Sequence, residues 1–100
     1  MSAVLRVLIE KDAPNKFVAS CLETGNVAVA EDYDTVRSII IEILQEEVAF
    51  AEKHDNFENL YRSPAPEDVK QRFKNVRPDQ IETLPLFPDV NTQVEMARAA

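Results

Sequence analysis

Residues 5–26 carry the strongest indication of the fold. Residues 5–12 read Leu-Arg-Val-Leu-Ile-Glu-Lys-Asp, and residues 17–26 read Phe-Val-Ala-Ser-Cys-Leu-Glu-Thr-Gly-Asn. Pro14 and Asn15 lie in the polar turn between the two runs, where proline fixes φ and asparagine tolerates the left-handed region. The pattern predicts a β-hairpin with strands at about 4–11 and 16–22.

A third strand and one long amphipathic helix are predicted to follow the hairpin. Gly25, the only glycine, marks the next turn, and a short strand is expected at about 27–30. Asp32 is a good N-cap, because its carboxylate accepts free N–H groups of the first helical turn. The helix is expected to end near His54. Its apolar side is broad and holds Tyr33, Val36, Ile39, Ile40, Ile43, Leu44, Val48, Phe50 and Ala51.

The chain has 100 residues, the size of one domain. We expect an α+β fold in which an antiparallel sheet of three or four strands packs on one long helix, in the order β-β-β-α. This domain would occupy residues 1–62. Within it, residues 57–62 are expected to form either a fourth short strand or an untidy end of the helix.

Residues 63–100 are broken by prolines and are predicted to form an irregular C-terminal extension. A two-turn helix is expected at 67–74, and an apolar strap at 83–90. A last small helix, capped by Asn91, is expected to contain Val94 and Met96.

Both faces of the predicted sheet are apolar. Leu5, Val7 and Ile9 share one face of the first strand and are expected to pack beneath the helix. The opposite face is also too apolar to lie in water, so the C-terminal extension or a neighbouring subunit must cover it. We therefore expect a homodimer or a higher oligomer. The candidate interface residues are Val4, Leu8, Val18, Leu84, Leu86 and Phe87.

The charge pattern favours protein partners over nucleic acid. Net charge is -7, and acidic residues crowd the predicted helix, so that its outer side suits a small basic protein. The densest basic group consists of Lys70, Arg72, Lys74 and Arg77. Such a group usually forms a solvated face, and we expect no DNA binding.

Candidate catalytic residues are few. His54, the only histidine, lies two turns along the predicted helix from Glu47, and the two are candidates for half of a metal or acid–base site. The alternative is that the helix overhangs the sheet here and leaves both residues in water or at a subunit contact. Cys21, the only cysteine, lies on the same strand face as Phe17 and is expected to be an inert core thiol. No phosphate loop, zinc spacing or catalytic triad is present. We predict no catalytic, metal or cofactor-binding residue, and no enzyme.

The lone cysteine fits a reducing compartment, and no apolar run is long enough to span a bilayer. No signal peptide is recognisable at the N-terminus. We therefore expect a cytoplasmic protein that does not enter membranes.

Residues 4–53 resemble HicB-type antitoxin domains. The resemblance rests on Ile9-Glu10-Lys11-Asp12, a four-residue turn, Phe17-Val18-Ala19, and then Cys21 and Glu23. The helix start, Asp32-Tyr33-Asp34-Thr35-Val36, is similar to that family's Thr-Leu-Glu-Glu-Ala start. The resemblance implies a partial dsRNA-binding-like fold and a partner-binding role, with no catalytic residues.

The chain departs from the family at three places. Thr24-Gly25-Asn26 stands where the family often has a Pro-Gly turn, and Glu31 stands where it often has a glycine. Residues 63–100 match neither the helix-turn-helix nor the ribbon-helix-helix that full-length members add. The resemblance therefore implies a solitary form without a DNA-binding domain.

Three hypotheses about function follow. The first is a non-catalytic, antitoxin-like module that binds or regulates a protein such as an RNA-cleaving toxin. The second is a small-molecule-binding or enzymatic protein with His54 and Glu47 at a subunit interface. The third is RNA binding by analogy with the fold, against which the negative charge argues.

Overall fold

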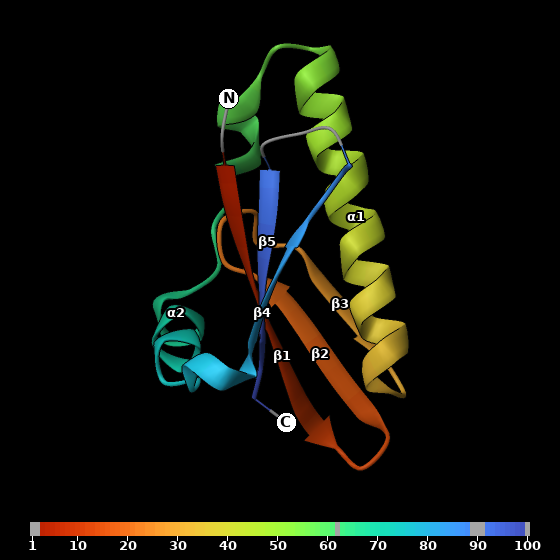
Figure 1. Cartoon of the computed structure of the whole chain (residues 1–100), viewed down its shortest axis with the longest axis vertical. Coiled ribbons are helices and arrows are strands. Elements are labelled where there is room, and N and C mark those ends of the chain that lie inside the picture. The colour runs from red at the N-terminus through yellow and green to blue at the C-terminus, as the bar shows by residue number, and fades with distance from the viewer. Residues whose placement is uncertain (1–2, 62, 89–91, 100) are drawn as a thin grey trace.

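The computed structural model describes residues 3–61, 63–88 and 92–99. A mixed sheet of five strands carries the long helix α1 on one face and the short helix α2 on the other, which makes an α+β fold (Figure 1). The elements are β1 (Ala3–Ala13), β2 (Lys16–Cys21), β3 (Val27–Ala30), α1 (Tyr33–Lys53), α2 (Glu67–Lys74), β4 (Ile81–Pro85) and β5 (Thr92–Arg98). Two 3-10 helices, η1 (Phe57–Tyr61) and η2 (Pro78–Gln80), lie in the connections.

The sheet has the strand order β3-β2-β1-β5-β4. Strands β1, β2 and β3 form the expected antiparallel hairpins, and β4 pairs antiparallel with β5. Strand β5, however, runs parallel to β1, from Ala3 opposite Thr92 to Ile9 opposite Arg98. The prediction of a purely antiparallel sheet of three or four strands was therefore wrong. The C-terminal segment returns through two helices and enters the sheet beside the first strand.

The predicted last helix was also wrong, because Val94 and Met96 belong to β5. Thr92, Val94 and Met96 are all buried, at the spacing of two that places strand residues on one face. The first part of the expected strap forms β4, and residues 57–61 form a 3-10 helix instead of a strand. The cap expected at Asn91 lies outside the described residues.

The main core lies between α1 and the sheet face that carries Leu5, Val7 and Ile9, as predicted. Val36, Ile40 and Leu44 of α1 are fully buried against it. The Asp32 carboxylate caps α1 by accepting the backbone N–H of Thr35 at 2.8 Å. The expected N-cap and helix length are thus confirmed, and His54 is the C-cap.

A second, smaller core covers the opposite sheet face. Leu8 and Leu22 are fully buried there beneath Val69 and Phe73 of α2. The predicted two-turn helix at 67–74 is confirmed and supplies this cover from within the same chain. The connection to α2 is held by a bond from the Ala65 N–H to the Leu22 carbonyl, 3.0 Å long.

The turn after β2 packs closely against the segment that leads to α2. Gly25 has a φ of +77°, in the left-handed region that glycine adopts without the strain a Cβ atom would bring. A Cβ atom at Gly25 would lie 1.9 Å from the Ser63 carbonyl oxygen. The only glycine of the sequence is therefore required twice, by its backbone conformation and by this close approach.

Candidate functional site

The flank of α1 that faces β3 carries exposed carboxylates that form no ion pair with any residue the structure describes. Gln45 donates to the carbonyl of Leu86, the residue after β4, at 2.9 Å. Because β4 and β3 are the opposite edges of the sheet, the other flank of the helix faces β3. Glu46 and Glu47 lie on that opposite flank, and Glu47 lines a small cavity together with Asn26, at the start of β3. Within the described part of the chain, no salt bridge involves Glu42, Glu46 or Glu47. We call these three residues, with Ile39, Ile43 and Phe50, the acidic flank of α1.

An aromatic side chain projects from this acidic flank. Phe50 was expected on the buried side of the helix, but 58% of its surface is exposed. Figure 1 shows the last turns of α1 extending past β3. These turns bury Val48 and Ala51 in the core with Leu60 of η1, and Phe50 on the flank stays outside that contact. Phe50 lines a shallow cavity of about 350 Å³ with Glu46, Glu47 and Asn59. Large exposed aromatic residues are frequent anchors of protein contacts.

The sheet edge beside this flank is apolar. Val27 is 57% exposed and Val29 is 52% exposed, both on the sheet face opposite α1. Ile39 and Ile43 on the helix are only partly buried. Apolar side chains therefore lie on both sides of the β3 edge, and the carboxylates lie at the helix side of it.

The two arginines of the basic group singled out in the sequence are paired with carboxylates of the chain itself. Arg72 binds Glu10 and Asp68, each at 2.8 Å. The hydrogen bond with Glu10 raises the pKa of Arg72, and the hydrogen bond from Arg72 lowers the pKa of Asp68. Arg77 also lies 3.4 Å from Asp79. Arg72 thus forms a network with Glu10 and Asp68, and Arg77 a separate pair with Asp79, so both arginines offer little free charge to a phosphate backbone.

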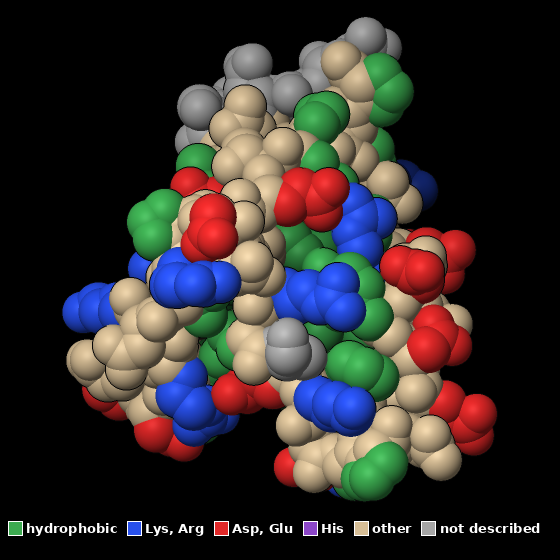
Figure 2. Space-filling model, turned by 60° about the horizontal axis from the view of Figure 1, so that its bottom comes forward, with side chains coloured by type: hydrophobic (Ala, Val, Ile, Leu, Met, Phe, Trp, Pro, Cys, Tyr) green, Lys and Arg blue, Asp and Glu red, His purple; other side chains and the backbone are tan. Residues whose placement is uncertain are grey.

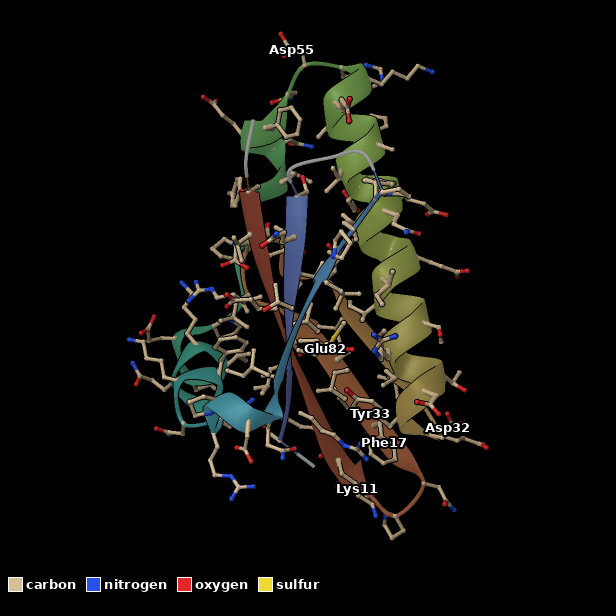
Figure 3. All side chains as sticks on the ribbon, viewed as in Figure 1. Lys11, Phe17, Asp32, Tyr33, Asp55 and Glu82 are labelled. Carbon is tan, nitrogen blue, oxygen red and sulfur yellow. The ribbon has the colours of Figure 1, made fainter. Side chains whose placement is uncertain are left out.

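A different set of cations was missed by the sequence analysis. The Lys11 ammonium lies 5.9 Å from the Phe17 ring centre, and the Arg98 guanidinium lies 4.1 Å from that of Tyr33. The Phe17 and Tyr33 rings are edge to face with their centres 6.5 Å apart. Figure 3 labels Lys11, Phe17 and Tyr33 at this end of the molecule. Local sequence carries no signal for this cluster, because the pairing of β1 with β5 brings residue 98 to the hairpin.

This cationic end of the molecule also carries acidic groups. Figure 2 shows Lys and Arg side chains with hydrophobic groups between them and acidic side chains alongside. A cavity of about 340 Å³ here is lined by Arg37 and Arg98, but also by Asp34, Asp79 and Glu82. Arg37 is bound to Glu82 at 2.8 Å. The mixture of signs selects no single class of charged ligand.

The candidate catalytic residues are not brought together. His54 stacks on Phe50 with ring centres 4.3 Å apart, and no hydrogen bond or ion pair with Glu47 is found among the described residues. No group of three or more potential ligands in the described ranges could hold a metal ion. Cys21 is buried, and burial raises the pKa of its thiol, although hydrogen bonds with Thr24 oppose the rise. A buried thiol with a raised pKa is a poor nucleophile.

The predicted interface residues lie in different environments. Leu8 and Leu86 are buried within the chain, whereas Val4 remains 45% exposed. Val18, Leu84 and Phe87 are partly buried. Whether any of the six contacts another subunit stays a prediction.

Comparisons with family models, curated proteins and solved structures found no match to this chain. Membership of the HicB-type family therefore stays a hypothesis drawn from the sequence. None of the helices among the described residues has the length and apolar character needed to cross a membrane.

Proposed function

We propose that the protein is a non-catalytic binding module that docks a basic protein on the acidic flank of α1. The observation that carries this proposal is that exposed carboxylates, unpaired within the described ranges of the chain, lie beside an exposed phenylalanine. Glu46 and Glu47 border the same shallow cavity as Phe50. Carboxylates at the rim would steer a basic partner and set the orientation of the complex, and the aromatic ring would supply the desolvated contact.

The mechanism that fits such a surface is occlusion. A module of this kind inhibits or regulates a protein by covering its basic surface, and no chemistry on the module's side is needed. An RNA-cleaving toxin is the proposed partner class, because such an enzyme needs a basic surface for RNA and because the sequence resembles HicB-type antitoxins. A cytoplasmic location belongs to the same proposal.

The experiment compares three baits in the native host. Wild-type protein should enrich a small basic protein, and the double variant Glu46→Gln with Glu47→Gln should lose it. The control variant Glu67→Gln with Asp68→Asn removes the same charge from α2, on the other sheet face, and should retain the partner.

The purified partner should then bind wild-type protein with an affinity that falls as salt concentration rises. Binding that is equal for both double variants, or that is insensitive to salt, would contradict docking on the acidic flank. Light scattering on the free protein tests the separate prediction of a homo-oligomer, which a monomeric mass at micromolar concentration would remove.

RNA binding is a second candidate, favoured by the two cation–aromatic pairs at the cationic end. Bases stack on aromatic side chains, and cations beside them bind phosphates. In that case, Arg98→Ala should weaken RNA binding and the α2 variant Lys74→Ala should not. If wild-type protein causes no salt-dependent mobility shift with RNA, this candidate is excluded.

A further inference from the structure

The outer edge of the sheet at β3 exposes unpaired backbone groups. In an antiparallel ladder, residues that bond to the neighbouring strand alternate with residues whose N–H and C=O point away from it. The Cys21 N–H donates to the Asn26 carbonyl at 2.9 Å, and this bond sets the alternation. With Ser20 opposite Val27 and Val18 opposite Val29, the backbone groups of Val27 and Val29 point outward. Within the described part of the chain, no loop or side chain bonds to them.

The two edges of this sheet differ in how they are protected. Proteins usually guard an edge with proline, lysine, inward charges or a bulge, because an open edge pairs with other chains. The β4 edge ends in Pro85 and carries Glu82, which is bound to Arg37. The β3 edge reads Val-Ala-Val-Ala and has none of these features. Both of its valines are more than half exposed.

We propose that β3 accepts an extended segment of a basic partner protein as an additional strand of the sheet. This inference rests on the proposed function and identifies how the partner binds beside the acidic flank. Outward N–H and C=O groups of Val27 and Val29 would bond to the incoming backbone, in the manner of strand addition. The side chains of the added strand would alternate between the two faces of the sheet.

The two faces of that added strand have different requirements. On the face opposite α1, its side chains would meet Val27 and Val29, which favours apolar residues. On the face toward α1, its side chains would reach Ile39 and Ile43 with their stems and Glu46 and Glu47 with their ends. Lys and Arg suit this position, because their long stems are apolar and their ends are cationic. The preferred segment therefore alternates apolar and basic residues.

Charge decides between a basic segment and a second copy of this chain as the occupant. Pairing of β3 with β3 of another copy would extend one sheet across a two-fold axis and place both α1 helices on the same face. The acidic flanks, including Glu46 and Glu47, would then face each other. Each copy also has a net charge of -7, so like charges would oppose this pairing. A basic strand would bond to the same backbone groups and would be attracted to the acidic flank.

The test uses the peptide acetyl-Lys-Val-Lys-Val-Lys-Val-amide as probe, with acetyl-Lys-Pro-Lys-Pro-Lys-Pro-amide as the control of equal charge. Binding is followed by NMR of the isotope-labelled protein and by fluorescence anisotropy of labelled peptide. The first peptide should bind saturably and slow hydrogen exchange at the Val27 and Val29 amides. The proline peptide should do neither, because proline lacks the N–H and cannot pair.

Matched variants separate the backbone contribution from the charge contribution. Val29→Pro removes an outward N–H but leaves the ladder bonds of Ala28 and Ala30 to β2, so the sheet should persist. This variant should bind the Lys-Val peptide about tenfold more weakly, which corresponds to one lost hydrogen bond. Val29→Thr keeps the N–H and the strand propensity, and should bind within about threefold of wild type.

The outcomes distinguish strand addition at β3 from binding to the acidic flank alone and from pairing with a second copy of the chain. If Glu46→Gln with Glu47→Gln weakens peptide binding while Val29→Pro does not, the acidic flank stands and strand addition is refuted. If Val29→Pro abolishes a dimer of the free protein, the edge pairs with a second copy and the basic occupant is refuted. If no saturable binding occurs below about 1 mM peptide, strand addition is refuted. The exchange measurement on wild-type protein remains decisive even if Val29→Pro fails to fold.

Discussion

The most informative stability prediction concerns Phe73, which anchors α2 to the sheet face opposite α1. Only 7% of its surface is exposed, and it packs in the same cluster as the fully buried Leu8 and Leu22. A phenylalanine side chain presents roughly 200 Å² and so loses most of that area to the core, which is worth roughly 4–5 kcal/mol at about 25 cal/mol per Å². Alanine keeps its Cβ contacts and the site relaxes in part. We therefore expect Phe73→Ala to reduce the free energy of unfolding by about 3–4 kcal/mol.

The assay is urea denaturation followed by circular dichroism, with Phe50→Ala as the matched control. Phe50 is the same residue type, lies on a helix and is 58% exposed. Its substitution should cost less than about 1 kcal/mol. With a urea dependence of about 1.5 kcal/mol per M, Phe73→Ala should lower the midpoint by roughly 2–3 M.

A particular result would refute this reasoning. If Phe73→Ala and Phe50→Ala differ by less than about 1 kcal/mol, α2 does not hold the second sheet face in solution. Another subunit would then have to cover Leu8 and Leu22, as the sequence alone left open. Agreement between free energies from urea and from heat would show that the unfolding is two-state and the comparison valid.

Three further predictions follow from single residues. Gly25→Ala should destabilise the protein by roughly 2–4 kcal/mol, because φ is +77° and the new Cβ would meet the Ser63 carbonyl oxygen. An unchanged melting temperature would contradict this close approach. Cys21 should resist thiol reagents at pH 7 until urea unfolds the chain, because burial raises its pKa, and stoichiometric labelling of native protein would contradict this. Hydrogen bonds from the Thr35 N–H and hydroxyl lower the pKa of Asp32 below its ordinary value of 3.8. Its stabilising contribution should therefore be complete above that value and be lost as pH falls through the lowered pKa, and NMR titration of its carboxyl carbon measures this directly.

Short-range patterns predicted the parts of the fold that depend on neighbouring residues. The hairpin, the strand at 27–30, the capped α1 and the two-turn α2 all follow from local periodicity and capping residues. The strand identity of β5 was missed, because a short apolar run suits either a helix or a buried strand. Its pairing with β1 decides between them, and that pairing joins residues about 90 positions apart.

The candidate site was likewise predicted from the sequence only in part. The acidic character of the α1 flank is present in the sequence, but the exposure of Phe50 is not, since helical periodicity placed it with the buried residues. The last turns of α1 extend past β3 and bury Val48 and Ala51 with Leu60 of η1, so Phe50 on the flank of the helix is left uncovered. The open β3 edge also escaped prediction, because an edge is defined only by the order of strands in the sheet.

Local sequence was enough to predict the elements of the N-terminal half, the acidic surface of α1 and the excess of apolar residues on the sheet. Each of these depends on side-chain chemistry and on contacts within a few residues. Long-range packing placed β5 between β1 and β4, set α2 over Leu8, and left β3 as an edge strand among the described residues. These features depend on which distant segments exclude water from one another, and that choice follows from the packing of the whole chain.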